Sequence, residues 1–483
     1  MNFYELIQMV GQNTLIYGGS LVAVLSILVF VHEWGHYIVA RMCGIRVEKF
    51  SIGFGKEIYG FNDKAGTRWK ISMIPLGGFV QLFGDTDPAS AGHSDEVKDG
   101  EEVREMTEEE RKVAFFTKKV WQRALVVVAG PSINYLFAIA LLTGLYMWHG
   151  QPVSPPTAAA VMTGSNAEKY GFEPHDYILT IGGKTINDFS DIRREMMVAL
   201  DEERKFVLER DGEVIEISAR PKRITMTDRF GFSSSIGVLG LIGAEKGILV
   251  ESITSIDGTQ YEDKQQVIDE LLKRMGTTFV IGLDNNGDIE GEEGGETAKT
   301  EEVAEEIDEA NVIDSLIIAP LADKNAELGL DKEGIEDILY LANVPPEQFI
   351  SHTPITAVQS AINESYVMTV SSLEALWQMV VGVRSATELG GIVRIGAITG
   401  ETATKGIVPL ILLTALLSIS LGFINLLPIP MLDGGHLLFF GIEAVIGRAV
   451  PEQIQEYAFR AGFVFLIGVM AFANLNDIYQ LIT

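Results

Sequence analysis

The sequence has very little cysteine and a marked shortage of positive charge. Among its 483 residues Cys43 is the only cysteine, so neither an intrachain disulfide nor a metal site built from several cysteines can form. There are 66 Asp and Glu residues against 37 Lys and Arg, which gives a formal net charge of −29 at pH 7. Because nucleic-acid binding depends on basic patches, we expect no nucleic-acid partner.

The N-terminal tail also lacks positive charge. Residues 1–13 contain no Lys or Arg, and the apolar run that follows continues into His32 and Glu33 without a small-residue cleavage site. A secretory signal peptide would have a basic start and such a site. We therefore interpret this run as a retained transmembrane helix.

Apolar residues make up 47% of the chain, and many gather in four long runs. A helix needs about 20 mostly apolar residues to cross a bilayer. The sequence therefore predicts a multi-pass α-helical membrane protein whose acidic parts lie in soluble segments. The four predicted spans are residues 14–40, 124–147, 406–427 and, as the least apolar, 457–475.

Basic residues near the span ends predict the orientation, because loops that stay in the cytoplasm are enriched in Lys and Arg. They concentrate in residues 41–123 and 428–456, which we expect to be cytoplasmic. Both termini and residues 148–405 are then extracytoplasmic, with Lys405 as an exception. The basic residues are Arg41, Arg46, Lys49, Lys56, Arg111, Lys112, Lys118, Lys119, Arg123, Arg448 and Arg460.

The motif His-Glu-x-x-His lies toward the cytoplasmic end of the first span. His32 and His36 are four residues apart, so both imidazoles lie on one helix face, where they can bind zinc. Glu33 between them can act as a general base toward water. Ionisable residues inside an apolar segment are functional candidates. The alternative is a pair of interfacial histidines at a helix end.

A second polar motif follows the third span, in Asn425-Leu-Leu-Pro-Ile-Pro-Met-Leu-Asp433-Gly-Gly-His436. A charged Asp near hydrocarbon costs about 3 kcal/mol unless it is paired or hydrated. Asp433 can supply the third protein ligand that a zinc ion on two histidines lacks. His436 is a rival third ligand, and a helix-capping Asp or an ion pair is the structural alternative.

Residues 46–83 predict a β-hairpin close to the metal motif. Val47–Ile52 and Trp69–Ile74 alternate, and Gly53-Phe54-Gly55 is typical of a turn. Such a hairpin could offer a strand edge to an extended peptide, with Gly53, Phe54 and Gly55 as candidate substrate-binding residues. The alternative is an ordinary cytoplasmic hairpin.

The second span contains Gly130-Pro131-Ser132-x-Asn134. A proline inside a membrane helix kinks it and frees a carbonyl group. Asn134 is a polar side chain that could form a hydrogen bond to a neighbouring helix. We interpret its role as structural.

The segment 155–405 is soluble in character. The order of predicted strands and helix over residues 155–240 resembles a bacterial PDZ domain, and Ile236, Gly237 and Val238 are candidates for its peptide-carboxylate loop. Residues 245–350 resemble a degenerate or permuted second PDZ domain, because front-half features appear late, at Asn325–Leu330. The acidic stretch 284–311 inside it predicts a solvated loop, with a calcium site as the alternative.

The two motifs and their setting resemble the site-2 protease family, and within it the bacterial regulator-of-sigma-E protease group. The resemblance covers nearly the whole chain, through His-Glu-x-x-His, the Gly-x-Gly hairpin, the PDZ modules and Asn-x-x-Pro-x-Pro-x-Leu-Asp-Gly-Gly. It implies Zn²⁺ held by His32, His36 and Asp433, with Glu33 as the base. Asn425 matches the family residue that holds substrate near the site.

The resemblance also implies a fold, a location and substrates. The expected fold is a membrane core made of residues 1–150 and 366–483, with a re-entrant β-hairpin and inserted α+β PDZ-like domains. The expected protein is a multi-pass zinc endopeptidase of the inner (plasma) membrane. It cleaves the transmembrane segments of single-span membrane proteins, such as anti-sigma factors, and remnant signal peptides within the lipid bilayer. The acidic insertion and the permuted second module depart from the family pattern.

Two other functions were weighed against proteolysis. A non-catalytic membrane-anchored PDZ adaptor would bind exposed C-termini, but binding needs neither Glu33 nor Asp433. A zinc transporter would need a pathway, which one metal motif and a large PDZ region do not suggest. The residues therefore favour an enzyme.

Overall fold

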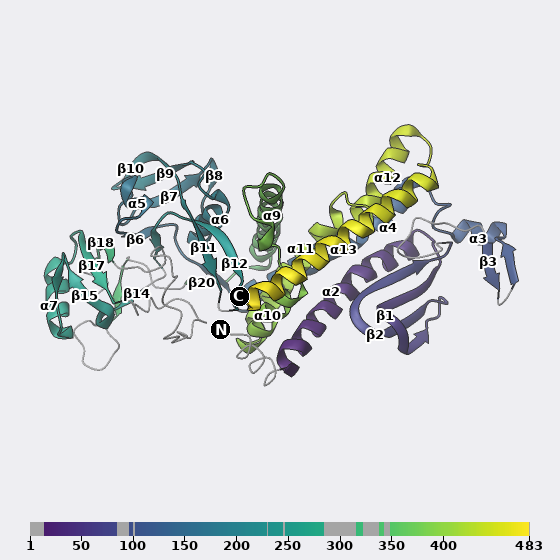
Figure 1. The fold of residues 1–483 in the computed structure, drawn as a ribbon, viewed down its shortest axis with the longest axis horizontal. Helices are drawn as coiled ribbons and strands as arrows, with labels where there is room; N and C mark the ends of the chain where they lie inside the picture. The colour runs from purple at the N-terminus through teal and green to yellow at the C-terminus, as the bar shows by residue number, and fades with distance from the viewer. Residues whose placement is uncertain are drawn as a thin grey trace.

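The computed structural model describes residues 14–84, 96–99, 102–228, 230–244, 247–284, 315–321, 338–341 and 348–482. In these ranges the protein is elongated (Figure 1). A group of long helices occupies the middle, the hairpin of β1 and β2 lies beside α2 at one end, and the modules rich in β-strands lie at the other.

Within the described ranges, four helices are long and apolar enough to cross a membrane. They are α2 (Thr14–Met42), α4 (Val120–Trp148), α11 (Ile407–Leu426) and α13 (Glu452–Ile482). Three of them contain a whole predicted span, and α11 covers the span 406–427 except for its two end residues, so the four predicted spans correspond to four candidate membrane-spanning helices. The least apolar run lies within a helix of 31 residues, well beyond the predicted limits.

Helix α4 is the central element of the helical core, since α2, α9, α11 and α12 all pack against it. Its approach to α2 depends on glycine. A Cβ added at Gly35 of α2 would lie 2.5 Å from the Ala129 carbonyl oxygen of α4. On the opposite side, Ser418 of α11 donates a hydrogen bond to the Asn134 carbonyl oxygen at 2.9 Å. These contacts hold the first, second and third predicted spans together.

The strands β1 (Val47–Asn62) and β2 (Arg68–Leu82) form the predicted hairpin. Phe50 of β1 is paired both with Trp69, near the start of β2, and with Val80, near its end. The hairpin therefore curls, and the two ends of β2 lie on either side of β1. Its depth in the membrane, which the term re-entrant describes, stays a prediction.

An aromatic cluster fixes this hairpin to α2. Phe50 stacks on Trp69 with ring centroids 4.2 Å apart, and Tyr37 of α2 packs edge-on against both rings. The Tyr37 hydroxyl and the Trp69 indole N–H each donate to Asp63 at 3.0 Å. Burial would raise the pKa of Asp63, but hydrogen bonds from Trp69, the Thr67 amide and Tyr37 outweigh it and hold the pKa below its ordinary value.

The chain between the hairpin and α4 is rich in charged residues. Its described part contains β3 (Glu96–Asp99), β4 (Glu102–Glu105) and the short helix α3 (Glu108–Val113). Thr107 and Glu110 form a capping box that starts α3. Residues 85–95 lie outside the described part.

The first module, residues 155–240, consists of short strands and one longer helix around a common core. Phe206, Ile178 and Leu208 are fully buried there and pack against Ile192 of the helix. With the flanking strands, its elements are β5 (Gln151–Val153), β6 (Ala158–Met162), α5 (Asn166–Lys169), β7 (Tyr177–Ile181), β8 (Lys184–Thr185), α6 (Phe189–Ala199), β9 (Arg204–Arg210), β10 (Glu213–Ala219), β11 (Lys222–Thr227), β12 (Ser233–Val238) and β13 (Leu241–Gly243).

The second module, residues 245–350, has its own core but shares a sheet with the first. The six-stranded sheet runs β13-β6-β18-β17-β15-β16, so β6 of the first module pairs directly with β18 of the second. Most of the acidic stretch 284–311 and all of Asn325–Leu330 lie outside the described residues. The elements are β14 (Gly247–Leu249), η1 (Val250–Ser252), β15 (Ile253–Ile256), β16 (Thr259–Gln260), α7 (Lys264–Arg274), β17 (Phe279–Leu283), β18 (Ser315–Ile318) and β19 (Ile338–Tyr340).

After the modules the chain returns to the helical core through a pair of short strands, β5 and β20, called the clip below. The strand β20 (Gln348–Ile350) pairs with β5, which directly follows α4. The helix α9 (Pro354–Val380) comes next and is capped by Thr353. It is followed by η3 (Ala386–Glu388), α10 (Ile392–Thr404), α11, α12 (Asp433–Ile446) and α13.

Candidate metal centre

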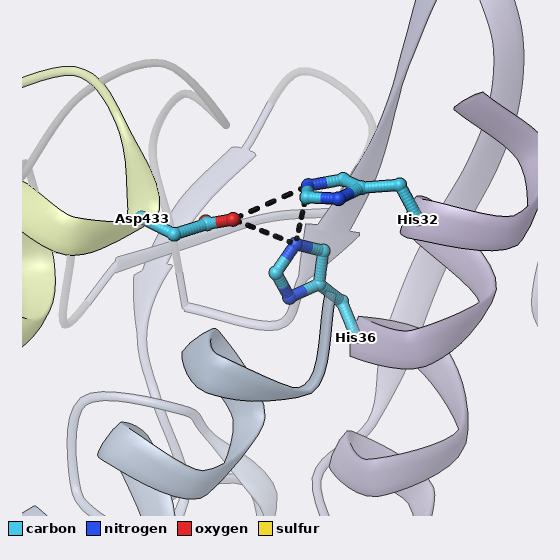
Figure 2. Close-up of side chains that lie close together, drawn as sticks. All are labelled: His32, His36 and Asp433. Carbon is cyan, nitrogen blue, oxygen red and sulfur yellow. Dashed lines mark hydrogen bonds and ion pairs between the residues drawn. The ribbon is translucent and has the colours of Figure 1, made fainter. Parts of the chain in front are cut away.

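Two elements that are distant in sequence bring three ligand side chains together. His32 and His36 lie one turn apart on α2, and Asp433 is the first residue of α12 (Figure 2). The distance from Asp433 Oδ2 is 3.2 Å to His32 Nε2 and 3.6 Å to His36 Nε2, and the two Nε2 atoms are 3.2 Å apart. The side chains of His32 and Asp433 are only 12% and 16% exposed.

This donor set fits a zinc ion. The ligand atoms of His32, His36 and Asp433 all lie within 4.8 Å of one another, and no other cluster of three His, Cys, Asp or Glu with this geometry occurs among the described residues. Asp433 Oδ2 is buried and lacks a hydrogen-bond partner within the described part of the chain. Two imidazole nitrogens and one carboxylate oxygen are the protein ligands of many catalytic zinc sites.

The position of Asp433 depends on the loop that precedes α12. Pro428 and Pro430 end the third predicted span, and Met431 adopts a φ of +87°. Directly after Asp433, a Cβ at Gly434 would overlap the Leu427 carbonyl oxygen, and one at Gly435 would lie 2.5 Å from that of Ile429. The Gly-Gly pair therefore lets α12 begin tightly against this loop, which places Asp433 opposite the histidines.

Glu33 lies next to the three ligand residues and is contacted by the hairpin. Val80 of β2 lines the same cavity as Glu33. Close approach of β2 requires Gly78, where a Cβ would lie 2.7 Å from Val29 and 3.3 Å from the Glu33 side chain. The hairpin and the motif on α2 thus form one site.

A cavity of about 490 Å³ opens at this site. His32, Glu33, His36 and Asp433 line it together with Gly78, Phe79, Val80 and Leu82 of β2. An ion pair between Arg123 and Glu443, 2.5 Å long, lies on its wall. The cavity is large enough for a short stretch of extended peptide beside the candidate ligand residues.

Comparison with known proteins gives the family. A model of peptidase family M50 matches residues 20–469, most of the chain. The chain belongs to peptidase family M50. Members of this family are zinc-dependent, so the protein is a zinc metalloprotease, and its four apolar helices make it an integral membrane protein. The resemblance drawn from the two motifs is thereby confirmed.

Relatives of this M50 peptidase align along almost their whole length. A protein of Mesorhizobium japonicum, named as a predicted zinc metalloprotease, is 33% identical over 456 residues, which is 94% of this chain and 96% of its own. The Regulator of sigma E protease of Haemophilus influenzae is 30% identical, over 96% of this chain and 98% of its own. The Metalloprotease MmpA of Caulobacter vibrioides is 28% identical, over 95% and 94%.

Not all of the other candidate residues line the cavity at the candidate metal centre. Asn425 lines the cavity, whereas Gly53, Phe54 and Gly55 do not, although the Phe54 ring stacks on Phe79 of its wall. His436 also lines the cavity, but its ring packs on Phe440 and Phe459 and the candidate ligand cluster does not include it.

The candidate peptide loop of the first module forms a separate site. Ile236, Gly237 and Val238 line an apolar cavity of about 160 Å³ between β12 and α6. At Gly237 the two elements are so close that a Cβ would lie 2.5 Å from the Met196 carbonyl oxygen. Whether this cavity takes a peptide stays a prediction.

Two contacts from α4 to the ligand histidines were not predicted. The Val126 carbonyl oxygen lies 2.9 Å from His36 Nδ1, and a Cβ at Gly130 would lie 2.5 Å from His36 Cε1. Asn134, assigned only a structural role from the sequence, has its amide 3.1 Å from His32 Nδ1. The motif Gly130-Pro131-x-x-Asn134 was the available signal, but its relation to α2 depends on how the helices pack.

Proposed function

We propose that this M50 peptidase is an intramembrane endopeptidase that cuts transmembrane segments of single-span membrane proteins. The observation that carries the proposal is the convergence of His32, His36 and Asp433 beside Glu33, on or next to helices apolar enough to cross a bilayer. In this proposal the two histidines and Asp433 hold zinc, which supplies Lewis-acid polarisation of the scissile carbonyl group and activates water. Glu33 takes a proton from that water and delivers it to the leaving amine.

The hairpin is proposed to hold the substrate extended. A transmembrane helix has its amide groups bonded internally, so it must unwind before a peptide bond can be attacked. Residues 78–82 of β2 pair with β1, and Gly78, Phe79, Val80 and Leu82 also line the cavity. A substrate strand added along β2 would pass the cavity that Glu33 and Asn425 also line.

The substrate class and membrane are proposed from the predicted orientation and from a relative. The relative of Haemophilus influenzae is named a Regulator of sigma E protease. Anti-sigma factors already trimmed on their outer side, and remnant signal peptides, fit a site that needs an unwound single span. The modules would then lie outside the cytoplasm, with the metal centre toward the cytoplasmic face of the inner membrane.

The modules are proposed to act as PDZ-like filters. Their bulk would exclude substrates that still carry a large outer domain, and the apolar cavity beside Gly237 would receive C-termini left by an earlier cut. The ion pairs from Arg194 to Glu364 and from Arg204 to Glu374 fix the first module to α9, which leads back into the helical core.

The test is proteolysis by the purified protein in lipid vesicles that contain a trimmed single-span reporter. The parent protein should cleave the reporter, a chelator should stop cleavage, and added zinc should restore it. Glu33→Gln should keep zinc and lose on the order of 10²–10⁴-fold in rate, because an amide cannot take the proton. Wild-type turnover by Glu33→Gln would show that Glu33 is not the base. Peptide binding without any cleavage by the parent would favour the adaptor function instead.

A further inference from the structure

The Asn134 side chain is buried in the helical core with only one half of its amide engaged. Asn134 is 0% exposed, and its Nδ2 lies 3.1 Å from His32 Nδ1. Its Oδ1 has no hydrogen-bond partner among the described residues. An unpartnered buried polar atom costs roughly 1–3 kcal/mol, so the position calls for a physical reason.

The two ligand histidines are oriented by different kinds of partner. His36 Nδ1 faces the Val126 main-chain carbonyl, which can only accept, so Nδ1 must carry the proton and Nε2 presents its lone pair. His32 Nδ1 faces a primary amide, which can donate through Nδ2 or accept through Oδ1. Only at His32 does the tautomer depend on the orientation of a side chain.

We propose that Asn134 is a positioning residue that selects the tautomer of His32 needed for binding zinc. With Nδ2 toward His32, the ring carries its proton on Nε2, the atom that lies 3.2 Å from Asp433 Oδ2 and that would have to bind the metal. With the amide turned by half a rotation, Oδ1 accepts from Nδ1–H and Nε2 is free to bind the metal. The proposal rests on the proposed role of His32 as a ligand.

Contacts between the surrounding helices fix the backbone at Asn134, so rotation of its side-chain amide is the main freedom that remains. Its carbonyl oxygen accepts from Ser418 of α11 at 2.9 Å, and α4 is held against α2 by the close contacts at Gly35 and Gly130. Among the described residues, the Asn134 side chain makes no hydrogen bond to α11, so it does not link α4 to α11. Its one contact of this kind is with His32, and partners of metal-bound histidines typically change metal affinity by roughly 10–100-fold.

The experiment measures the zinc dissociation constant of purified full-length protein in detergent, by competition with a chelator of known affinity. Asn134→Leu has a similar volume but no acceptor, and its dissociation constant should rise roughly 10–100-fold. Asn134→Asp keeps an acceptor oxygen and should stay within about threefold of the parent protein, since the carboxylate can orient His32 equally well. Rescue by Asp distinguishes orientation of the ring from mere packing.

A matched control lies on the same helix. Thr143 of α4 also has a buried side-chain oxygen without a partner among the described residues. Thr143→Val should therefore leave zinc affinity unchanged. Asp433→Ala serves as the benchmark for loss of the site itself: if that variant keeps the parent's zinc, the proposed ligand set is wrong, whatever Asn134 does.

The proposal is overturned if Asn134→Leu binds zinc as tightly as the parent protein does. It is also overturned if Thr143→Val or Asn134→Asp loses as much zinc affinity as Asn134→Leu. Circular dichroism checks that each variant is folded. If Asn134→Leu does not fold, Asn134→Ala, which removes the amide without adding a branched side chain, takes its place with the same expected loss.

Discussion

At the scale of single residues, one glycine on α4 decides whether both imidazoles can face Asp433. A Cβ at Gly130 would lie 2.5 Å from His36 Cε1 and 2.9 Å from His32 Cε1, well inside contact distance. Gly130→Ala should therefore displace the rings and lower proteolytic activity on the order of 10²-fold, as expected for a misplacement near 1 Å. Zinc content and reporter cleavage are the measurements.

Gly144 provides the control for this prediction. It lies on the same helix, and nothing lies within 4 Å of a Cβ built there. Gly144→Ala should keep both zinc and activity, since alanine also has the better helix propensity. Equal losses in the two variants would mean that the effect comes from α4 as a whole and not from crowding of the histidines.

Asp433 is the residue whose charge the site depends on. In Asp433→Asn the neutral amide is a poorer zinc ligand than a carboxylate, so zinc occupancy or activity should fall severely. Metal analysis together with reporter cleavage tests this. If both persist, another group such as His436 completes the site.

The convergence of the three candidate ligand residues could be predicted from the sequence because their spacing suggests one shared site. His32 and His36 share a helix face whatever the rest of the chain does, and Asp433 follows a proline-rich break that ends a span. The partners Val126, Gly130 and Asn134 could not be assigned, because which turn of α4 faces α2 depends on side-chain packing over two helices. Residue type and spacing therefore predict which chemistry a side chain can perform, but they do not predict which residue of another helix it will contact.

At the scale of elements, the hairpin depends on a close backbone contact at Gly53. Gly53 has a φ of +84°, and a Cβ there would overlap the Ile74 carbonyl oxygen. Gly53→Ala should shift β2 away from Glu33 and lower the cleavage rate roughly 10-fold or more, while zinc content stays at the parent value. Unchanged cleavage would mean that the hairpin does not position the substrate.

Gly66 is the matched control in the same hairpin. Its φ of +86° gives Gly66→Ala a similar backbone strain, but nothing lies within 4 Å of a Cβ built there. This variant should be far more active than Gly53→Ala. The comparison separates backbone strain from the steric overlap with Ile74.

Element boundaries followed the sequence where a local signal exists. The spans and the alternating strands of residues 46–83 have counterparts in the structure. The helix that contains the predicted span 457–475 extends beyond it at both ends, from Glu452 to Ile482. The apolar run marked only the middle part of this helix.

At the scale of the whole molecule, the path of the chain suggests how to remove the modules without breaking the core. The clip between β5 and β20 brings the chain back to the end of α4. A deletion of residues 155–346, bridged by a short Gly/Ser linker, leaves both strands of the clip in place. This deletion should keep catalysis and allow cleavage of a reporter that still carries its bulky outer domain.

The measurement for this deletion compares full-length and trimmed reporters in the same membranes. Discrimination as strong as that of the parent would place the filter elsewhere, in the hairpin or in residues 366–405. Loss of activity on both reporters, with zinc still bound, would mean that the modules position the substrate and do not merely filter it.

The way the modules join could not be predicted from the sequence. Strands β6 and β18 pair across the first and second modules, although more than 150 residues separate them in the chain. Pairing of this kind leaves no periodic signal, since it depends on which strand edges remain free after each module folds. The sequence therefore suggested two modules in succession but not their common sheet.

The central claim is that this M50 peptidase cuts a peptide bond inside a transmembrane segment. Its most direct test is the mass of the fragments produced from a single-span reporter in lipid vesicles by the zinc-loaded parent protein and by zinc-loaded Glu33→Gln. The account predicts one cut inside the apolar span of the reporter, toward its cytoplasmic end, and no such fragments from Glu33→Gln. Fragments that all end outside the apolar span, or the same fragments from both proteins, would contradict it.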